Sequence, residues 1–242
     1  MTPPVPNANA TSEDFEFDAL NDTPNYRTAL IKEFGPALHG NVMEIGAGIG
    51  QVTDLLLQLP QITRLLSIEP HTGFATRFRQ THPHAELIEG TIENAPAGAD
   101  WDGILSINVL EHIEADEPEL ARYAKLLSAR HGALCLFVPA RPEIYAPIDK
   151  DFGHFRRYTR PELQRKLQAV GFTLERLTYY NWIGYFAWWF NFCILKKRGF
   201  ELAKVRLFDR RIFPLVHALE SSLIRPPFGQ SLLAIARPSR SE

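Results

Sequence analysis

Apolar and polar residues follow one another along this chain in blocks that fit strands alternating with helices. Short apolar runs predict seven strands, at residues 41–46, 64–69, 86–89, 101–107, 133–138, 173–178 and 231–236. Apolar residues with helical spacing predict helices between them, at residues 25–34, 49–59, 72–82, 116–129 and 160–170. Strands that alternate with helices indicate an α/β fold with a mostly parallel sheet covered on both faces.

The first predicted strand runs directly into a glycine-rich turn, Glu44-Ile-Gly-Ala-Gly-Ile-Gly50. Glycines at alternate positions let the backbone turn sharply and approach a ligand at contact distance. The helix that follows would aim its free N–H groups at that ligand. The second strand ends at Glu69, where a carboxylate is placed to bind a ribose diol. Together the turn and Glu69 predict a ligand that contains a nucleoside.

Glu44 narrows the choice of nucleoside. The dinucleotide fingerprint is G-x-G-x-x-G, whereas this turn reads G-x-G-x-G with Glu44 two residues ahead of the first glycine. A carboxylate there would repel a pyrophosphate but would suit an amine and a sulfonium. At these residues the chain resembles the class I S-adenosylmethionine-dependent methyltransferases, whose first motif reads (D/E)-x-G-x-G-x-G.

The resemblance implies a Rossmann-like seven-stranded sheet of order 3-2-1-4-5-7-6 with strand 7 antiparallel. It also implies S-adenosyl-L-methionine as the cofactor and methyl transfer as the reaction. Glu44 and the glycines would hold the methionine end, Glu69 the ribose, and Thr91 with Ile92 the adenine. The cofactor-binding residues predicted in this way are Tyr26, Glu44, Gly46, Ala47, Gly48, Gly50, Glu69, Pro70, Thr91, Ile92, Asn108 and Val109.

Two histidines are candidates for catalysis. His112 follows strand 4, beside the expected methyl donor, and His154 lies in a polar loop after strand 5. A general base is needed only if the acceptor must lose a proton. Asn108, Glu111 and His112 would share one helical face. The similar ubiquinone-pathway O-methyltransferases carry Glu-x-x-Glu-His there and can use a divalent ion. Because Asn108 replaces the first glutamate, we predict no metal.

The loop Gly153-His-Phe-Arg-Arg-Tyr-Thr159 is the most distinctive stretch after the glycine turn. Its adjacent arginines could grip a carboxylate or phosphate, or could pair with Asp149, Asp151 or Glu162. Together with Val138-Pro-Ala140 and the segment after strand 6, this loop resembles bacterial small-molecule methyltransferases of types 11 and 12. The predicted substrate-binding residues are Arg156, Arg157, Tyr158, Tyr180, Asn181 and Trp188.

Residues 179–230 predict a helical insertion between strands 6 and 7. Its first part, 179–195, is almost wholly apolar and precedes Lys196-Lys-Arg198. About fifteen helical residues span only about 22 Å, too short to cross a bilayer. The run would suit a lid over an apolar substrate, a homodimer face, or a peripheral membrane contact through 179–198. Helical spacing predicts one aromatic stripe, made by Tyr185, Trp188, Trp189 and Phe192.

Composition predicts the domain organisation and the cellular compartment. Of the 242 residues, 45% are apolar, so we predict one domain over 13–242 after a disordered 1–12. The two cysteines suggest no disulfide framework and the N-terminus lacks an apolar core, which favours a cytoplasmic protein.

Charge is divided unevenly along the chain. Residues 1–140 hold 8 Lys/Arg against 19 Asp/Glu, whereas 141–242 hold 18 against 9. The basic part would face something anionic, or the two parts would simply attract each other. We therefore expect a small, apolar acceptor with an anionic group, such as a lipid-like, terpenoid or aromatic acid. Nucleic acid is disfavoured because the basic residues form no long strip. The alternative is a non-catalytic regulatory or scaffold protein that binds the same nucleoside.

Overall fold

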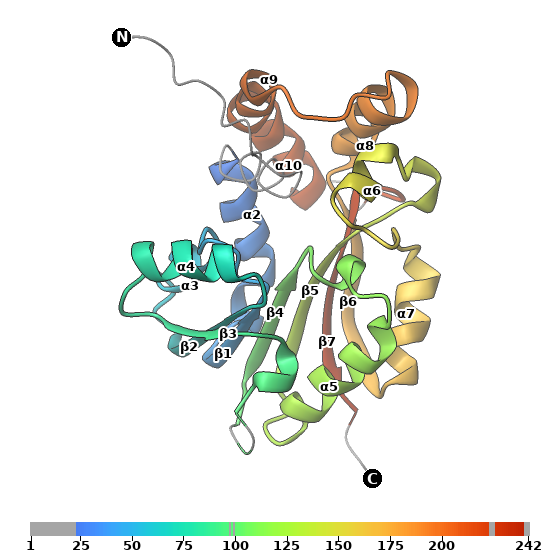
Figure 1. The fold of residues 1–242 in the computed structure, drawn as a ribbon. Helices are drawn as coiled ribbons and strands as arrows, with labels where there is room; N and C mark the ends of the chain where they lie inside the picture. The colour runs from blue at the N-terminus through green and yellow to red at the C-terminus, as the bar shows by residue number, and fades with distance from the viewer. Residues whose placement is uncertain (1–22, 97, 99, 223–225, 240–242) are drawn as a thin grey trace.

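A seven-stranded sheet forms the centre of the computed structural model, which describes residues 23–96, 98, 100–222 and 226–239. Its strand order is β3-β2-β1-β4-β5-β7-β6, and β7 runs antiparallel to both of its neighbours (Figure 1). The predicted fold class and strand order are confirmed, whereas the predicted disorder of 1–12 lies outside the described residues. The strands are β1 Gly40–Ile45, β2 Ile62–Glu69, β3 Glu86–Glu89, β4 Gly103–Ile107, β5 Ala133–Pro139, β6 Phe172–Tyr180 and β7 Ser231–Pro238.

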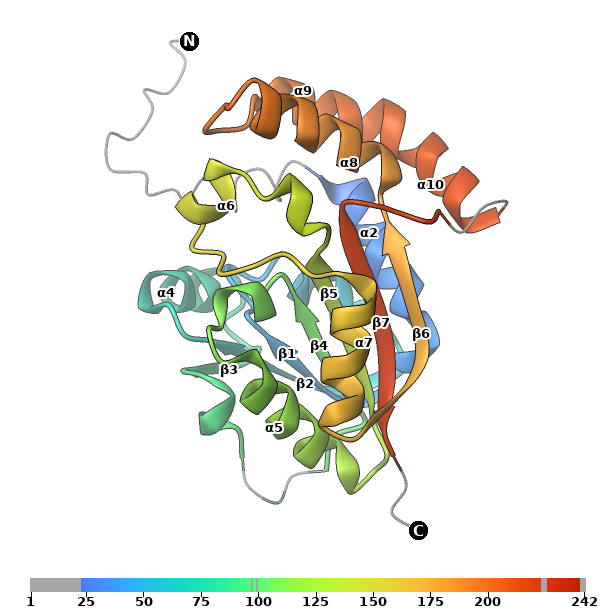
Figure 2. The ribbon, with the colours of Figure 1, turned by 90° about the vertical axis from the view of Figure 1, so that its right-hand side faces the viewer.

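Helices cover both faces of the sheet (Figure 2). Buried side chains of α5 and α7 pack on one face, and those of α2 and α3 pack on the other. All residues of β5 are buried, as expected for a central strand between two helical layers. The helices that surround the sheet are α2 Pro24–Phe34, α3 Thr53–Leu56, α4 Thr72–Thr81, α5 Asp116–Ser128, α6 Pro147–Asp151 and α7 Arg160–Ala169.

Two of the differences from the predicted boundaries affect the site. The helix predicted over 49–59 is only the four-residue α3, because the glycine turn keeps left-handed backbone as far as Gly50, with φ of 93°. The strand predicted over 173–178 extends to Tyr180, so that the insertion begins at residue 181. Tyr180 therefore packs within the sheet layer and is 4% exposed.

The helical insertion, residues 181–230, joins β6 to β7 as predicted. It contains α8 Trp182–Trp188, which continues as a π-helical stretch Trp189–Ile194. It also contains α9 Leu202–Leu207, a second π-helical stretch Phe208–Ile212, and α10 Phe213–Ser222. These helices lie together beyond the carboxyl ends of the central strands, at the top of Figure 1.

The predicted aromatic stripe on this insertion was wrong. Trp188 and Phe192 are buried, whereas Trp189 is 44% exposed on the other side of the helix. Gly184, Trp188 and Phe192 recur at every fourth position on the inner face, and the backbone is π-helical from Trp189 onward. The aromatic residues therefore divide between an inner packing face and an outer face.

Candidate functional site

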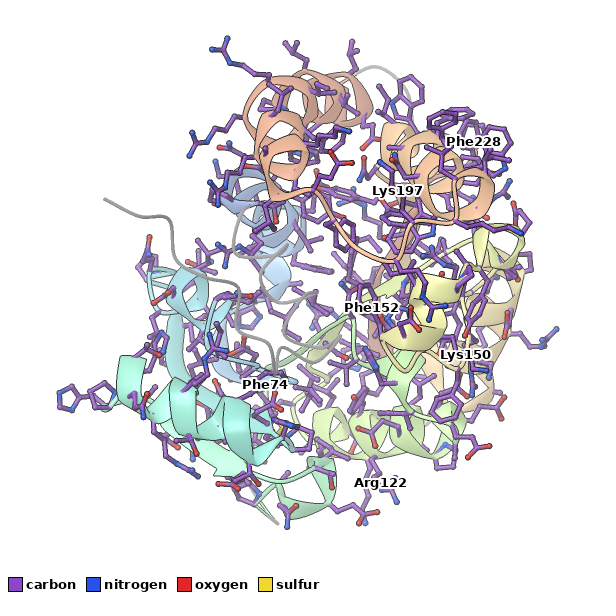
Figure 3. All side chains as sticks on the ribbon, turned by 45° about the horizontal axis from the view of Figure 1, so that its top comes forward. Phe74, Arg122, Lys150, Phe152, Lys197 and Phe228 are labelled. Atoms are coloured by element: carbon purple, nitrogen blue, oxygen red, sulfur yellow. The ribbon has the colours of Figure 1, made fainter. Side chains whose placement is uncertain are left out.

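A cavity of about 350 Å³ lies at the carboxyl ends of β1, β2 and β4. Phe74 of α4 lines one side of it and Phe152, which follows α6, lines another (Figure 3). The residues predicted for cofactor binding that line this first cavity are Tyr26, Glu44, Gly46, Ala47, Glu69, Pro70, Thr91, Ile92, Asn108 and Val109.

The glycine turn shapes this cavity through its backbone. Gly46, Gly48 and Gly50 have φ values of 72°, 58° and 93°, which side-chain-bearing residues rarely adopt. A Cβ on Gly46 would collide with Val109, and one on Gly50 would collide with the ring of His82. Gly48 and Gly50 hold the form of the turn and do not line the cavity. Their predicted contact with the cofactor stays a prediction.

Two buried carboxylates lie on the cavity wall. Glu44 Oε2 accepts hydrogen bonds from Thr53 Oγ1 at 2.6 Å and from Ser67 Oγ at 2.8 Å. Burial raises the pKa of Glu44 to about 7 despite these hydrogen bonds. Glu69 accepts from the backbone N–H of Gly48 at 2.7 Å and of His71 at 2.8 Å. Both carboxylates are thus fixed in place before any ligand arrives.

The residues present fit a nucleoside that carries positive charge. Glu44 would meet an amine or sulfonium, and Glu69 lies where a ribose would be held. Ile92 and Phe74 supply apolar wall for an aromatic base, since both line the cavity and are buried. A pyrophosphate would bring negative charge beside Glu44, so a dinucleotide does not fit.

A second cavity of about 450 Å³ adjoins the first. The two share Tyr26, Asn108, Phe137 and Phe152 as walls. The rest of the second cavity is formed mainly by the helical insertion, with Ala187, Trp188, Asn191 and Phe192 on one side and Lys204, Leu207, Phe208 and Ile212 on the other. The predicted residues that line it are His154, Arg157, Asn181 and Trp188.

His112 and His154 meet where the two cavities adjoin. His112 lines the first cavity and His154 the second, and their ring centroids are 4.7 Å apart. Desolvation by the surrounding protein, and secondarily the neighbouring His154, lower the pKa of His112 to about 4, although part of the side chain still faces solvent. Asp149 lies 3.0 Å from His154 Nδ1 and orients that ring. Burial pushes the pKa of Asp149 upward, but His154 and Arg157 together hold it below its usual range.

Glu111 joins the two histidines. It is fully buried, and its ligand atoms lie within 4.8 Å of those of His112 and His154. One carboxylate and two imidazoles suit a divalent ion. The predicted sharing of a helical face by Asn108, Glu111 and His112 was wrong, because Asn108 has φ of 51° and precedes a short 3₁₀ turn, Leu110–His112. The absence of a metal stays a prediction.

The two arginines of the loop are paired with carboxylates. Arg157 Nη2 lies 2.8 Å from Asp149 Oδ1, with both side chains buried, and its guanidinium stacks on Trp188 at 4.4 Å. Arg156 Nη1 lies 3.0 Å from Asp116 Oδ2. Of the two alternatives left open by the sequence, pairing is the one observed, with Asp149 among the predicted partners and Asp116 in place of Asp151 or Glu162.

Arg156, Tyr158 and Tyr180 line neither cavity. Tyr158 is fully buried, and its hydroxyl donates to Asp116 Oδ2 at 2.9 Å. Tyr180 packs among Tyr26, Phe137 and other rings. The contact of these three residues with the substrate stays a prediction. Their positions outside both cavities do not favour it.

Sequence reasoning missed several residues of the two cavities. Glu111, which lines the second cavity, was considered only as a metal ligand. Asp149, which lines neither cavity but orients His154, was considered only as a partner for arginine. Nothing in the sequence around Phe74 and Phe152 indicates a ligand site, because a single aromatic residue in a helix or loop is usually expected to pack in the core. Lys197 belonged to a visible basic cluster, and the structure brings it with Lys204 to the second cavity.

Comparisons with known proteins agree with this architecture. A family model described as a methyltransferase domain matches residues 21–177. An S-adenosylmethionine-dependent methyltransferase from Mesorhizobium loti has a TM-score of 0.61 at 15% identity, with 89% of this chain and 99% of that chain covered. The plantazolicin methyltransferase BpumL, solved with SAH, has a TM-score of 0.60 at 16% identity, with 93% and 88% covered. DhpI, also solved with SAH, has a TM-score of 0.54 at 14% identity, with 95% and 97% covered. A search of curated proteins gave no match.

Proposed function

The chain belongs to the methyltransferase-domain family, and from this premise we propose that it methylates a small apolar molecule that carries an anionic group. The protein is an enzyme, and S-adenosylmethionine is its cofactor. The acceptor class is the part of this statement that goes beyond the family. Lipid-like, terpenoid and aromatic acids are the candidates.

The adjoining second cavity carries the proposal. Methyl transfer by in-line displacement needs the acceptor atom held close to the donor carbon and aligned with the bond that breaks. Four residues form a common wall of both cavities, so a molecule in the second cavity lies against the first. Most of the surface of the second cavity is apolar, although polar side chains also line it, and this surface would favour an apolar acceptor body.

When bound, S-adenosylmethionine supplies a methyl group activated by a sulfonium. The chain itself would bind, orient and exclude water. Glu44 would offset the positive charge of the donor, and Glu69 would accept hydrogen bonds from the ribose. Phe137 and Phe152 would exclude water from the boundary between the cavities, where both line the wall.

His154 is the candidate base for an acceptor that must lose a proton. It lines the second cavity beside the shared wall, and Asp149 holds its Nδ1. A carboxylate at this position stabilises the imidazolium that forms when the ring takes a proton, as the aspartate of a catalytic triad does. His112, neutral and on the first cavity, would contact the donor side.

Two lysines of the insertion favour an anionic group on the acceptor. Lys197 and Lys204 both line the second cavity, and both pair with Glu201 at 2.7 Å. Two lysines that share one carboxylate leave one positive charge in excess among these three side chains. Arg157 contributes no such excess, because Asp149 neutralises it. The head group would therefore lie toward Lys197 and Lys204.

The test is methyl transfer from labelled S-adenosylmethionine to a panel of amphiphilic carboxylic and phosphoric acids, with sugars and amino acids as comparison acceptors. Ala187→Phe would fill part of the second cavity without touching the first. We expect it to raise the acceptor KM at least about tenfold while cofactor affinity stays within about twofold.

The matched control is Leu57→Phe, at an exposed position that lines neither cavity. Transfer to sugars or amino acids with none to the acids would overturn the acceptor class. Cofactor binding without transfer to any acceptor, including crude lipid and metabolite extracts, would favour the non-catalytic scaffold instead.

A further inference from the structure

The helical insertion exposes an unusual amount of apolar surface. On its first helical segment, 182–195, five large apolar side chains are 44% to 52% exposed: Phe186, Trp189, Phe190, Ile194 and Leu195. On its second, 202–222, four are 41% to 70% exposed: Leu207, Ile212, Leu215 and Leu219. We call these nine residues the outer face. An exposed apolar patch of this kind marks an interaction surface.

The inner sides of the same helices are well packed. Trp188 and Phe192 form a buried cluster with Ile144 and with Ile148 of α6, and Phe213 joins the core cluster that contains α2. Trp188 Nε1 also donates to the backbone oxygen of Ile144 at 3.1 Å. The insertion is therefore a stable layer with an apolar inner side and an apolar outer face. The outer face is therefore available to bind a separate partner.

The net charge of the insertion indicates which class of partner would bind the outer face. Residues 182–222 carry seven Lys/Arg against three Asp/Glu. Of the three acids, Asp209 is fully buried, and Glu220 accepts from the backbone N–H groups of Asn181 and Trp182. Among the described residues of the insertion, the exposed basic ones are Lys196, Arg198, Lys204, Arg206, Arg210 and Arg211.

These basic residues interleave with the outer face. Arg206, Arg210 and Arg211 flank Leu207 and Ile212, and Lys196 follows Leu195 directly. In Figure 3, which turns this end of the molecule forward, Lys197 and Phe228 both lie on it. The ring of Phe228 packs against Tyr185 and Phe186 and extends the aromatic surface. Apolar side chains beside Lys and Arg are the pattern of helices that lie in a membrane interface.

The second cavity opens at this outer face. Leu207 and Ile212 belong to both, since they line the cavity and are 58% and 41% exposed. Lys197 and Lys204 line the same cavity. An amphiphile lying in a lipid leaflet could thus enter tail first between apolar rims, with its anionic head near the lysines.

We propose that the outer face docks this enzyme on an anionic lipid bilayer and that the acceptor is drawn from that bilayer. The origin of the acceptor in the bilayer rests on the proposed function, whereas the docking does not. None of the helices within the described ranges has the length and apolar composition needed to span a membrane. A second copy of the chain fits less well, because a twofold contact would bring the same basic patch against itself.

Vesicle co-sedimentation tests the docking. The full-length protein should bind vesicles of phosphatidylcholine with roughly 30 mol% phosphatidylglycerol, and bind pure phosphatidylcholine at least about tenfold more weakly. Phe190→Glu with Leu215→Glu should weaken binding to the anionic vesicles by about tenfold or more. Arg210→Gln with Arg211→Gln should weaken it by about tenfold as well, and should make binding less sensitive to salt.

The matched control is Leu57→Glu, an equally exposed leucine outside the insertion, which should leave vesicle binding unchanged. Every variant should keep wild-type affinity for S-adenosylmethionine, which separates docking from the proposed function. Absence of vesicle binding by the wild type, or equal binding by the Phe190→Glu/Leu215→Glu variant, would overturn the proposal. So would a wild-type dimer in light scattering that this variant converts to a monomer, because the outer face would then be covered by a second copy.

Discussion

At the scale of single residues, buried carboxylates give the two cavities their chemistry. Glu44 is 3% exposed and keeps its position through Thr53 and Ser67, but burial still makes its charged form costly. Asp149 is more deeply buried and yet stays ionised, because His154 and Arg157 face it directly. The two acids therefore differ in pKa because Asp149 faces cationic or imidazole side chains, whereas the hydrogen bonds to Glu44 come from neutral hydroxyls.

Cofactor affinity should rise with pH around neutrality. The pKa of Glu44 is about 7 in the empty protein, and a sulfonium and an amine would favour its charged form. Binding should therefore release a proton, and affinity at about pH 6 should be about tenfold weaker than above about pH 8. Calorimetry in buffers of different ionisation enthalpy measures both quantities. Glu44→Gln should bind more weakly and show neither effect, and proton uptake on binding would contradict this role.

Stability of the empty protein should fall over the same range. The folded pKa of Glu44, about 7, lies above the ordinary value of 4.5. Its contribution is fully present below 4.5 and is lost as pH rises through 7. Thermal unfolding should thus show a lower Tm at about pH 8 than at about pH 5.5, relative to Glu44→Gln. A pH-independent difference between the two proteins would contradict the raised pKa.

His154→Asn should lower kcat by about 10²-fold if the ring takes a proton from the acceptor. Cofactor affinity should stay within about twofold, because the side chain lines the second cavity and not the first. His131→Asn is the control, since His131 lines neither cavity and its φ of 50° suits asparagine. An unchanged kcat would leave orientation as the whole of the rate enhancement.

A further experiment tests whether His154 binds a divalent metal ion together with Glu111 and His112. The expectation that no ion is needed rests on Asn108, which stands where the similar ubiquinone-pathway enzymes have their first glutamate. Activity after dialysis against a chelator should remain within about twofold of the untreated enzyme. Loss of activity that Mn²⁺ or Zn²⁺ restores would instead assign Glu111, His112 and His154 as ligands.

At the scale of elements, the helical insertion and the first helix are bound to each other by Asp209. This fully buried carboxylate from the second π-helical stretch accepts from the backbone N–H of Asn25 at 3.2 Å and of Tyr26 at 2.8 Å. It thereby serves as the N-terminal cap of α2, where Thr23 makes no side-chain cap. Because Tyr26 lines both cavities, this one carboxylate connects the insertion to the walls of both.

Asp209→Ala should lower the free energy of unfolding by about 2–4 kcal/mol, because charge-assisted hydrogen bonds are lost in a buried place. It should also weaken cofactor binding several-fold through displacement of Tyr26. Chemical denaturation and calorimetry measure the two effects. Asp209→Asn keeps one acceptor oxygen and should show a smaller loss in both, and Glu201→Ala serves as a control on the same insertion. A destabilised variant with wild-type cofactor affinity would show that α2 does not carry the coupling.

At the scale of the whole molecule, both cavities lie at the carboxyl end of the sheet. The first is bordered by α2, and the second by a layer built from α2 and the insertion. This layer is held to the sheet by aromatic packing of Tyr26, Phe137, Tyr180 and Phe213. A ligand in the first cavity would therefore contact parts of the chain that are distant in sequence.

Binding of the demethylated cofactor should slow amide hydrogen exchange in α2 and in residues 202–216 as well as in the glycine turn. The reason is that Tyr26, Asp209 and Phe213 join these segments to one wall of the cavity. Hydrogen exchange with mass spectrometry measures it, with α7 on the opposite face as the internal control. Protection confined to the glycine turn and β2 would show that the layer does not respond to the cofactor.

The sequence by itself determined the sheet, the glycine turn and the placing of Glu44 and Glu69 on the cavity wall. These features follow from local rules: apolar periodicity sets strands and helices, and glycine spacing sets a turn that other residues cannot adopt. The strand order came with the family resemblance, which rests on the same short motif. The acceptor class was an expectation from charge and aromatic content, and it stays a proposal.

Only the tertiary structure decided which side chains meet. Asp209 caps a helix that begins far earlier in the chain, His154 reaches Glu111 and His112 from another loop, and Tyr158 is buried. The division of the aromatic run into an inner and an outer face likewise came from the packing of the insertion, which buries Trp188 and Phe192 and leaves Trp189 exposed. A sequence pattern records the spacing of residues along one element. Contacts between elements depend on how buried surfaces and charges are satisfied together in three dimensions, and no local pattern contains that information.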